Sequence, residues 1–226
     1  MRPALCMLAA VLIASVGCGS SANGDGGAAN GDGGTAGQRL AAAVRASRSV
    51  EDVRTSNRLM HSFAGTKLKL RSRVRQKPDG SLMHARIRVS ESVGQFRRHQ
   101  DVQMIVADGR IFARYGGRWR RVEDTSPHFS YDEALALIRR IANVESVGAG
   151  HYRGDLNVAR HTALEPLRLL EEGRAHEATV DVLVDAQRRV RRFGLSFKSD
   201  KQQDDLEARV EVVSFDKGLQ IESPEG

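Results

Sequence analysis

Apolar and charged positions alternate with a period of two through much of residues 54–123. Strands with one apolar and one charged face are half-buried and antiparallel, so this stretch predicts a series of antiparallel strands. Turn sequences separate the runs, and we therefore expect a β-meander. The turns are Lys77-Pro78-Asp79-Gly80, Asp108-Gly109 and Gly116-Gly117. The apolar positions are Leu68, Leu70, Val74, Met83, Ala85, Ile87, Val89, Val102, Met104, Val106, Ile111, Ala113 and Tyr115.

The second half of the chain predicts more strands and interrupts them with helices. Strands are expected over residues 178–184, 190–198 and 206–215, with a less regular extended stretch over about 150–159. Residues 38–49 have the period of a short amphipathic helix.

Two further helices are expected. Ser130-Tyr131-Asp132-Glu133 is a capping-box pattern, and the apolar stripe behind it predicts a helix to about Val144. A third, short helix is expected over residues 166–172, before Gly173.

Together these elements predict an α+β fold with about eight to ten antiparallel strands and two or three helices. Because a sheet this large and this one-sided must curl, we expect a half-barrel wrapped over the helices. We expect residues 38–226 to form this single domain, and we expect the protein to be a monomer.

The N-terminus has the pattern of a bacterial export signal. Arg2 precedes an apolar run over residues 5–16 that is too short to span a bilayer. Small residues then precede Cys18, as in a lipobox, although Ser15 stands where Leu is usual. We expect residues 1–17 to be removed and Cys18 to carry acyl chains such as palmitate; an ordinary signal peptide is the alternative.

Residues 18–37 predict a flexible tether. They contain no bulky apolar side chain after Cys18 but eight Gly, so they have nothing to bury. The chain has two Cys, of which Cys6 lies in the signal and Cys18 would be acylated. The folded body would then contain no thiol, which excludes cysteine nucleophiles, thiolate metal sites and disulfides there.

Charge is distributed unevenly over the 226 residues. The net charge is +7, but residues 67–121 contain 15 Lys and Arg against 4 Asp and Glu, whereas residues 122–226 contain 14 against 20. The first region predicts a basic strand face that could bind anionic lipid headgroups or wall polymers. A solvated face with a compositional Arg bias is the alternative, since Arg outnumbers Lys 29 to 6. The basic face comprises Lys67, Lys69, Arg71, Arg73 and Arg75.

The apolar side of the same strands is the candidate ligand-binding surface. Met83 and Met104 suit an adaptable apolar pocket, although core packing is the more common role of Met. Every lining candidate would also be a core position if the sheet is filled. The candidates are Leu68, Leu70, Met83, Ile87, Met104, Ile111, Leu135 and Ile138.

No pattern of catalytic or metal-binding residues is evident. The seven His have no helical or HExxH-like spacing, and no GxSxG or glycine-rich phosphate loop occurs. Asp132 and Glu133 are better explained by the helix N-terminus than by acid–base chemistry. Arg118-Trp119-Arg120-Arg121 could stack on nucleic acid, but an exported protein would not meet it. We expect no enzyme activity, cofactor, metal or nucleic-acid partner.

Four segments resemble the LolA-like superfamily and, within it, the actinobacterial lipoproteins of the LppX/LprG type. They are the hairpin over residues 108–119, His151-Tyr152-Arg153-Gly154-Asp155-Leu156, the strand–turn–strand over residues 182–190, and residues 213–224. The resemblance implies a half-barrel with an apolar cavity that carries lipid acyl chains.

We therefore expect a lipoprotein of the cell envelope, anchored on the extracytoplasmic face of a membrane, that binds an acyl lipid or glycolipid in its concave face. The alternative is a surface interaction or envelope-sensor lipoprotein with a packed core that contacts a protein or an anionic polymer.

Overall fold

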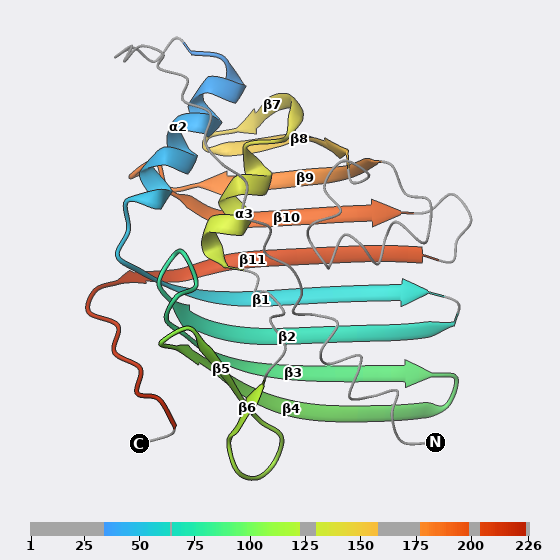
Figure 1. The fold of residues 1–226 in the computed structure, drawn as a ribbon. Coiled ribbons are helices and arrows are strands. Elements are labelled where there is room, and N and C mark those ends of the chain that lie inside the picture. The colour runs from blue at the N-terminus through green and yellow to red at the C-terminus, as the bar shows by residue number, and fades with distance from the viewer. Residues whose placement is uncertain (1–33, 64, 123–129, 158–176, 199–203, 225–226) are drawn as a thin grey trace.

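The computed structural model describes residues 34–63, 65–122, 130–157, 177–198 and 204–224. Within them the chain forms one eleven-stranded antiparallel sheet, in the order β6-β5-β4-β3-β2-β1-β11-β10-β9-β8-β7. The sheet is curved and remains open, with β6 and β7 as its two edges (Figure 1). The expected large antiparallel sheet with helices is confirmed.

Eleven strands exceed the eight to ten expected. They are β1 (Asp52–Phe63), β2 (Thr66–Gln76), β3 (Met83–Val93), β4 (Phe96–Ala107), β5 (Arg110–Arg114), β6 (Arg120–Val122), β7 (Ala142–Gly148), β8 (His151–Asn157), β9 (Glu177–Val184), β10 (Val190–Lys198) and β11 (Asp204–Asp216). The strand missed by the sequence pattern is β7, whose first three residues fall within the stretch that was expected to be helical. In addition, β6 is only three residues long, too short to show a period.

The turns of the meander form where the sequence predicts them. Asp108 and Gly109 both have positive φ angles, 53° and 68°, as a type I′ hairpin turn requires. The amide of Gly80 donates a 2.9 Å hydrogen bond to the carbonyl of Lys77, which closes the turn between β2 and β3. These turns hold β2, β3, β4 and β5 in consecutive antiparallel register.

Both described helices begin with a capping box. In α2 (Ala36–Arg48) the box joins Thr35 and Gln38, and in α3 (Tyr131–Ile138) it joins Ser130 and Glu133 as expected. In each box, the side chain of each residue accepts a hydrogen bond from the backbone amide of the other. Two amides at the start of the helix that would otherwise lack an acceptor are therefore paired.

The helix α3 ends at Ile138, so the expected extension to Val144 is wrong. Residues 142–148 instead form β7, which pairs with β8. Gly154 of β8 makes this pairing possible, because a Cβ atom there would lie only 2.5 Å from the carbonyl oxygen of Ala142. Pairing at the sheet edge therefore overrides local helix propensity.

The helices lie over only part of the sheet. Figure 1 shows α2 and α3 on the side of the sheet that carries β7 to β11. Their buried residues, including Leu40, Val44, Leu135 and Ile138, form one hydrophobic cluster with β1 and β8 to β11. No described helix is long and apolar enough to cross a membrane. The expected helix over residues 166–172 and the expected signal and acylation segment lie outside the described residues.

Candidate functional site

One face of the sheet, here called the inner face, carries most of the apolar side chains of β1 to β5. Ile105, Ala107 and Phe112 lie on the opposite face and form a separate cluster there. The register places Leu70 of β2 opposite Val89 of β3, and Ile87 of β3 opposite Val102 of β4. It also places Met104 of β4 opposite Ala113 of β5. Because Cα partners in an antiparallel sheet point to the same side, these residues share one surface.

Six of the eight candidate lining residues lie on this inner face. Leu68, Met83 and Met104 are buried there, and the others are partly buried. The six are Leu68, Leu70, Met83, Ile87, Met104 and Ile111.

The inner face is divided into separate hydrophobic clusters. Val74, Met83, Ala85, Met104 and Val106 form a cluster of their own, with Ile87 and Ile111 packed against it. We call these seven residues the meander cluster. No residue of α2 or α3 belongs to it.

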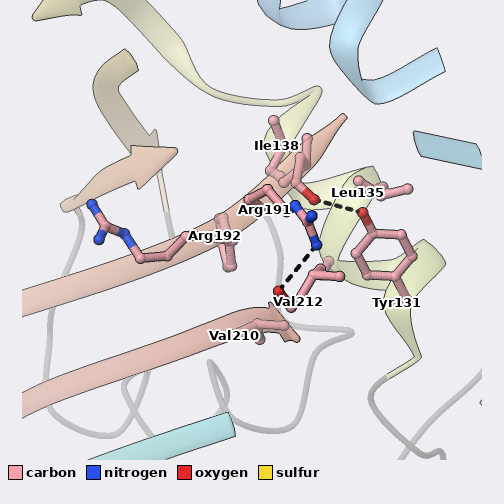
Figure 2. A pocket seen from close by; sticks show the side chains of 10 residues that line it. Tyr131, Leu135, Ile138, Arg191, Arg192, Val210 and Val212 are labelled. Carbon is pink, nitrogen blue, oxygen red and sulfur yellow. Dashed lines mark hydrogen bonds between the residues drawn. The ribbon is translucent and has the colours of Figure 1, made fainter. Parts of the chain in front are cut away.

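The remaining two candidates, Leu135 and Ile138, belong instead to the cluster that α2 and α3 form with β1 and β8 to β11, here called the helix-covered cluster. Leu70 also packs against this cluster. With Tyr131 of α3 and Val210 and Val212 of β11, both α3 candidates line a hollow against β10, shown in Figure 2. The hollow is too narrow to hold a water molecule, so these side chains are packed core. The structure therefore does not bring the two α3 residues together with the meander cluster.

A short polar stripe, which no sequence pattern predicted, crosses the inner face along β1 and β2. Three buried side-chain oxygens there have no hydrogen-bond partner among the described residues: Oγ1 of Thr55, Oδ1 of Asn57 and Oε1 of Gln76. The Asn57 amide nitrogen donates a 3.2 Å bond to Oγ of Ser72 on the neighbouring strand. Buried unpaired acceptors cost stability, so this stripe is a place where bound donor groups would be favourable. The only sequence signal was polar residues at inward positions of β1 and β2.

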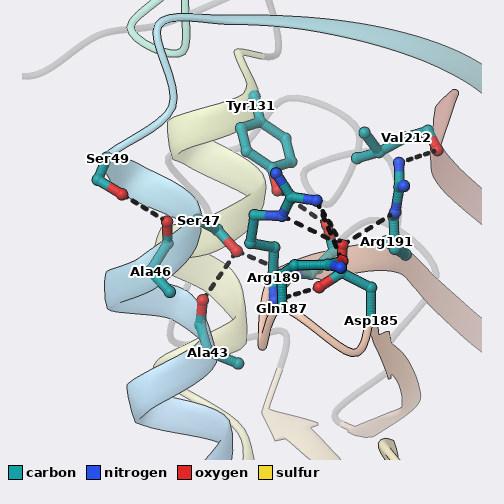
Figure 3. A network of polar contacts seen from close by, with 11 residues as sticks. Ala43, Ala46, Ser47, Ser49, Tyr131, Asp185, Gln187, Arg189, Arg191 and Val212 are labelled. Carbon is teal, nitrogen blue, oxygen red and sulfur yellow. Dashed lines mark hydrogen bonds and ion pairs between the residues drawn. The ribbon is translucent and has the colours of Figure 1, made fainter. Parts of the chain in front are cut away.

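A second polar network joins the helices to β10 and the hairpin before it (Figure 3). Asp185 accepts from the backbone amide of Arg189 at 2.8 Å and pairs with the guanidinium groups of Arg189 and Arg191. Burial alone would raise the pKa of Asp185, but the hydrogen bonds from Arg189 outweigh it and hold the pKa below its usual value. The two guanidinium groups also lie over the ring of Phe215. Each member of this network is paired, which indicates a structural role.

The opposite, outer face of β1 to β3 is basic as expected. Lys67, Arg71, Arg73 and Arg75 are exposed, and Lys69 is partly exposed. Arg71 of β2 lies between Arg58 of β1 and Arg88 of β3 as Cα partners. Arg88 pairs with Asp101 at 2.7 Å, whereas the five residues of the basic face have no ion-pair partner in the described part of the chain.

His84 lies within this basic surface. Burial and the charges of Arg86, Arg75 and Arg114 all lower the pKa of His84. Its Nε2 atom is buried, and no residue in the described part of the chain forms a hydrogen bond with it. The positive charges of three strands, β2, β3 and β5, therefore act on one point of the outer face. Arg114 also lies 5.0 Å from the ring centre of Trp119, which packs against Ile105 and Phe112 at this edge of the sheet.

The acidic residues at the start of α3 are capping residues. Glu133 accepts a 2.7 Å hydrogen bond from the amide of Ser130, and burial raises its pKa. Burial also raises the pKa of Asp132. Among the residues that the structure covers, no three His, Cys, Asp or Glu side chains are grouped closely enough to hold a metal ion.

Comparison with known proteins reveals similarity only at the level of structure. No family model matches the sequence, and no curated protein matches it either. The structure of LprF from Mycobacterium bovis is similar with a TM-score of 0.53 and 11% identity, over 84% of this chain and 96% of that one. Lipoprotein LppX from Mycobacterium tuberculosis is similar with a TM-score of 0.50 and 12% identity, over 83% and 98%. The expected resemblance to these actinobacterial lipoproteins is therefore confirmed in the fold.

Proposed function

We propose that this protein is a membrane-anchored extracytoplasmic lipoprotein that binds or carries an acyl lipid or glycolipid on the inner face of β2 to β5, as a half-barrel wrapped over its helices. Residues 1–17 would be the export signal, residues 18–34 the lipidated Cys and its tether, and residues 35–226 the lipid-binding domain. The expected tether over residues 18–37 is shortened because Thr35 caps α2. The fold shared with lipoprotein LppX supports this proposal.

The observation that carries the proposal is the separation of two hydrophobic clusters. α2 and α3 complete the first cluster, whereas the meander cluster contains residues of β2 to β5 alone. This cluster includes Met83 and Met104, which are buried and whose unbranched side chains adapt to ligands of different shape. An acyl chain placed on it would gain about 0.8 kcal/mol for each buried methylene group, so binding needs no covalent chemistry.

A matched pair of isoleucines tests where the ligand binds. Ile87 packs against the meander cluster and Ile141 against the helix-covered cluster, and both are partly buried. With cis-parinaric acid as the fluorescent probe, Ile87→Ser should weaken binding about tenfold. Ile141→Ser should leave the affinity within about twofold, since its cluster does not meet the ligand. If the wild-type protein takes up no probe, the lipid-binding function is wrong.

The proposed anchor has its own test. Cys18→Ala should release the protein from the membrane fraction of cells that process lipoproteins, because two acyl chains give stable attachment. Unchanged retention in the membrane fraction would contradict the anchor.

A second candidate function is an interaction of the basic face with an anionic polymer or protein, on a body whose core is fully packed. The row of Arg58, Arg71 and Arg88 supports it, because like charges directly opposite each other destabilise a sheet. A polyanion bound across the row would relieve this repulsion.

Charge reversal at the centre of the row tests this candidate. Arg71→Glu should stabilise the free protein by about 0.5–1 kcal/mol, since two attractive pairs replace two repulsive ones. It should also weaken binding of inorganic polyphosphate. Unaltered polyphosphate binding would leave only the solvated-face interpretation.

A further inference from the structure

The tip of the β3–β4 hairpin exposes apolar side chains to solvent. Val93 and Phe96 are Cα partners on either side of the two-residue turn Gly94-Gln95, and Gly94 has a φ angle of 57°. Phe96 is 81% exposed and Val93 is 48% exposed. The fold gains little from these two side chains, because neither belongs to a hydrophobic cluster of the described residues.

The β4 side of this tip is exposed on both faces. The first four residues of β4, from Phe96 to His99, are all exposed, although alternate residues of a strand point to opposite faces. Both faces of the hairpin are therefore in solvent. In Figure 1 the hairpin lies at the end of the sheet away from α2 and α3.

The tip has an apolar side and a cationic side. Val93 and Phe96 continue the inner face, in the same row as Thr66 of β2. The next residues along the three strands, Lys67, Ser92 and Arg97, form a row in which Ser92 is the Cα partner of the other two, and they point to the outer face. On the inner side the next row contains Arg98, opposite Glu91. Lys67, Arg97 and Arg98 are exposed, and none has an ion-pair partner in the described ranges.

We propose that this hairpin tip docks on an anionic lipid bilayer, with Phe96 and Val93 in the interfacial region and Lys67, Arg97 and Arg98 at the headgroups. An aromatic ring next to cations matches the chemistry of an anionic bilayer interface, where apolar burial and electrostatic attraction add. Each Lys or Arg close to such a surface contributes about 1 kcal/mol, which corresponds to about fivefold in affinity.

Docking in this orientation places the open end of the inner face at the membrane. Val93 and Phe96 are the last pair of β3 and β4 on the inner face, which also carries the meander cluster. The docking itself does not depend on the proposed lipid binding, so either can fail without the other.

A fluorophore placed at the tip of the full chain tests the proposal, whatever attaches the protein to the membrane. NBD is attached to a cysteine that replaces Phe96, or to a control cysteine that replaces Val213, which is 58% exposed near the opposite end of β11. The wild-type chain treated with the same reagent corrects for Cys6 and Cys18. Vesicles contain equal parts of phosphatidylglycerol and phosphatidylcholine, or phosphatidylcholine alone.

We expect the label at position 96 to shift its emission to the blue and to be quenched by nitroxide lipids in the anionic vesicles, whereas the label at position 213 does neither. Adding Arg97→Glu should lower the inserted fraction about fivefold or more. Water-like emission at position 96 would overturn the proposal. Equal insertion into both kinds of vesicle would overturn the assignment of an anionic surface.

Discussion

The hydroxyl oxygen of Ser47 accepts a 2.7 Å hydrogen bond from the backbone amide of Val190, 143 residues further along the chain. The same hydroxyl donates a 2.8 Å bond to the carbonyl oxygen of Ala43 within α2. Ser47 is completely buried, so it connects the first helix to the start of β10 within the core. A polar residue on the buried side of α2 thereby fixes how the helix lies on the sheet.

Replacing Ser47 by Ala should lower the free energy of unfolding by about 1–3 kcal/mol, because the buried amide of Val190 loses its acceptor. Ser49→Ala is the matched control: its hydroxyl also donates to a carbonyl of α2, that of Ala46, but it is exposed. The control should lose less than about 0.5 kcal/mol. Urea unfolding measures both, and equal losses would contradict the role assigned to Ser47.

The buried phenol of Tyr131 predicts a loss of stability at alkaline pH. Burial raises the pKa of Tyr131 to about 12, and its hydroxyl donates a 3.0 Å bond to the carbonyl of Val190. Because the folded state holds the proton more tightly than the unfolded state, the contribution is complete below pH 10 and is lost as the pH rises to about 12. The two-unit difference corresponds to about 2–3 kcal/mol.

Tyr131→Phe isolates this effect from the titration of other groups. The difference in unfolding free energy between wild type and variant should be constant up to pH 10 and should move in favour of the variant above it. A difference that does not change between pH 9 and pH 11.5 would show that the phenol is not protected in the folded state.

Ala substitutions at two glycines with positive φ angles distinguish the cost of backbone strain from the cost of steric contact. A Cβ atom at Gly150 would lie 2.6 Å from the carbonyl oxygen of Val184, whereas one at Gly94 would meet nothing within 4 Å. Both Ala substitutions should cost about 1–2 kcal/mol for the left-handed conformation. Gly150→Ala should cost about 1–3 kcal/mol more, since β9 must move away. Thermal unfolding compares the two variants, and equal costs would contradict this close approach.

The pKa of His84 reports the electrostatic field of the outer face. Arg86 is the largest of the nearby charges that lower this pKa, after burial itself. Arg86→Gln should therefore raise the pKa of His84, as measured by NMR titration of its ring protons. Arg97→Gln, at the hairpin tip, is the control and should leave it unchanged. A lowered or unaltered pKa in Arg86→Gln would contradict the arrangement of charges described above.

The sheet could be predicted from sequence because its signals are local. The alternation of Leu68, Leu70 and Val74 with basic residues assigns two faces to β2, and the turn at Asp108-Gly109 sets the next register. The same alternation correctly placed six lining candidates on one side. Such positions are fixed by a period of two, which needs no knowledge of distant residues.

What the sequence could not show depends on contacts between distant segments. Residues 142–144 continue the apolar stripe of α3, but the absence of a side chain at Gly154 allows them to join the sheet edge. Leu135 and Ile138 were assigned to the ligand surface because helical period identifies a buried side without saying which cluster it joins. The polar stripe of Thr55, Asn57 and Gln76 is apparent only once β1 and β2 are paired.

The central claim is that the inner face of β2 to β5 holds an acyl lipid. Native mass spectrometry of the full chain, purified from a bacterial envelope without detergent exchange, tests it most directly. We predict a species heavier than the polypeptide and its anchor by the mass of one lipid, released by collisional activation and reduced in Ile87→Ser but not in Ile141→Ser. A protein that carries only its own mass, and takes up no lipid from vesicles, would contradict the claim.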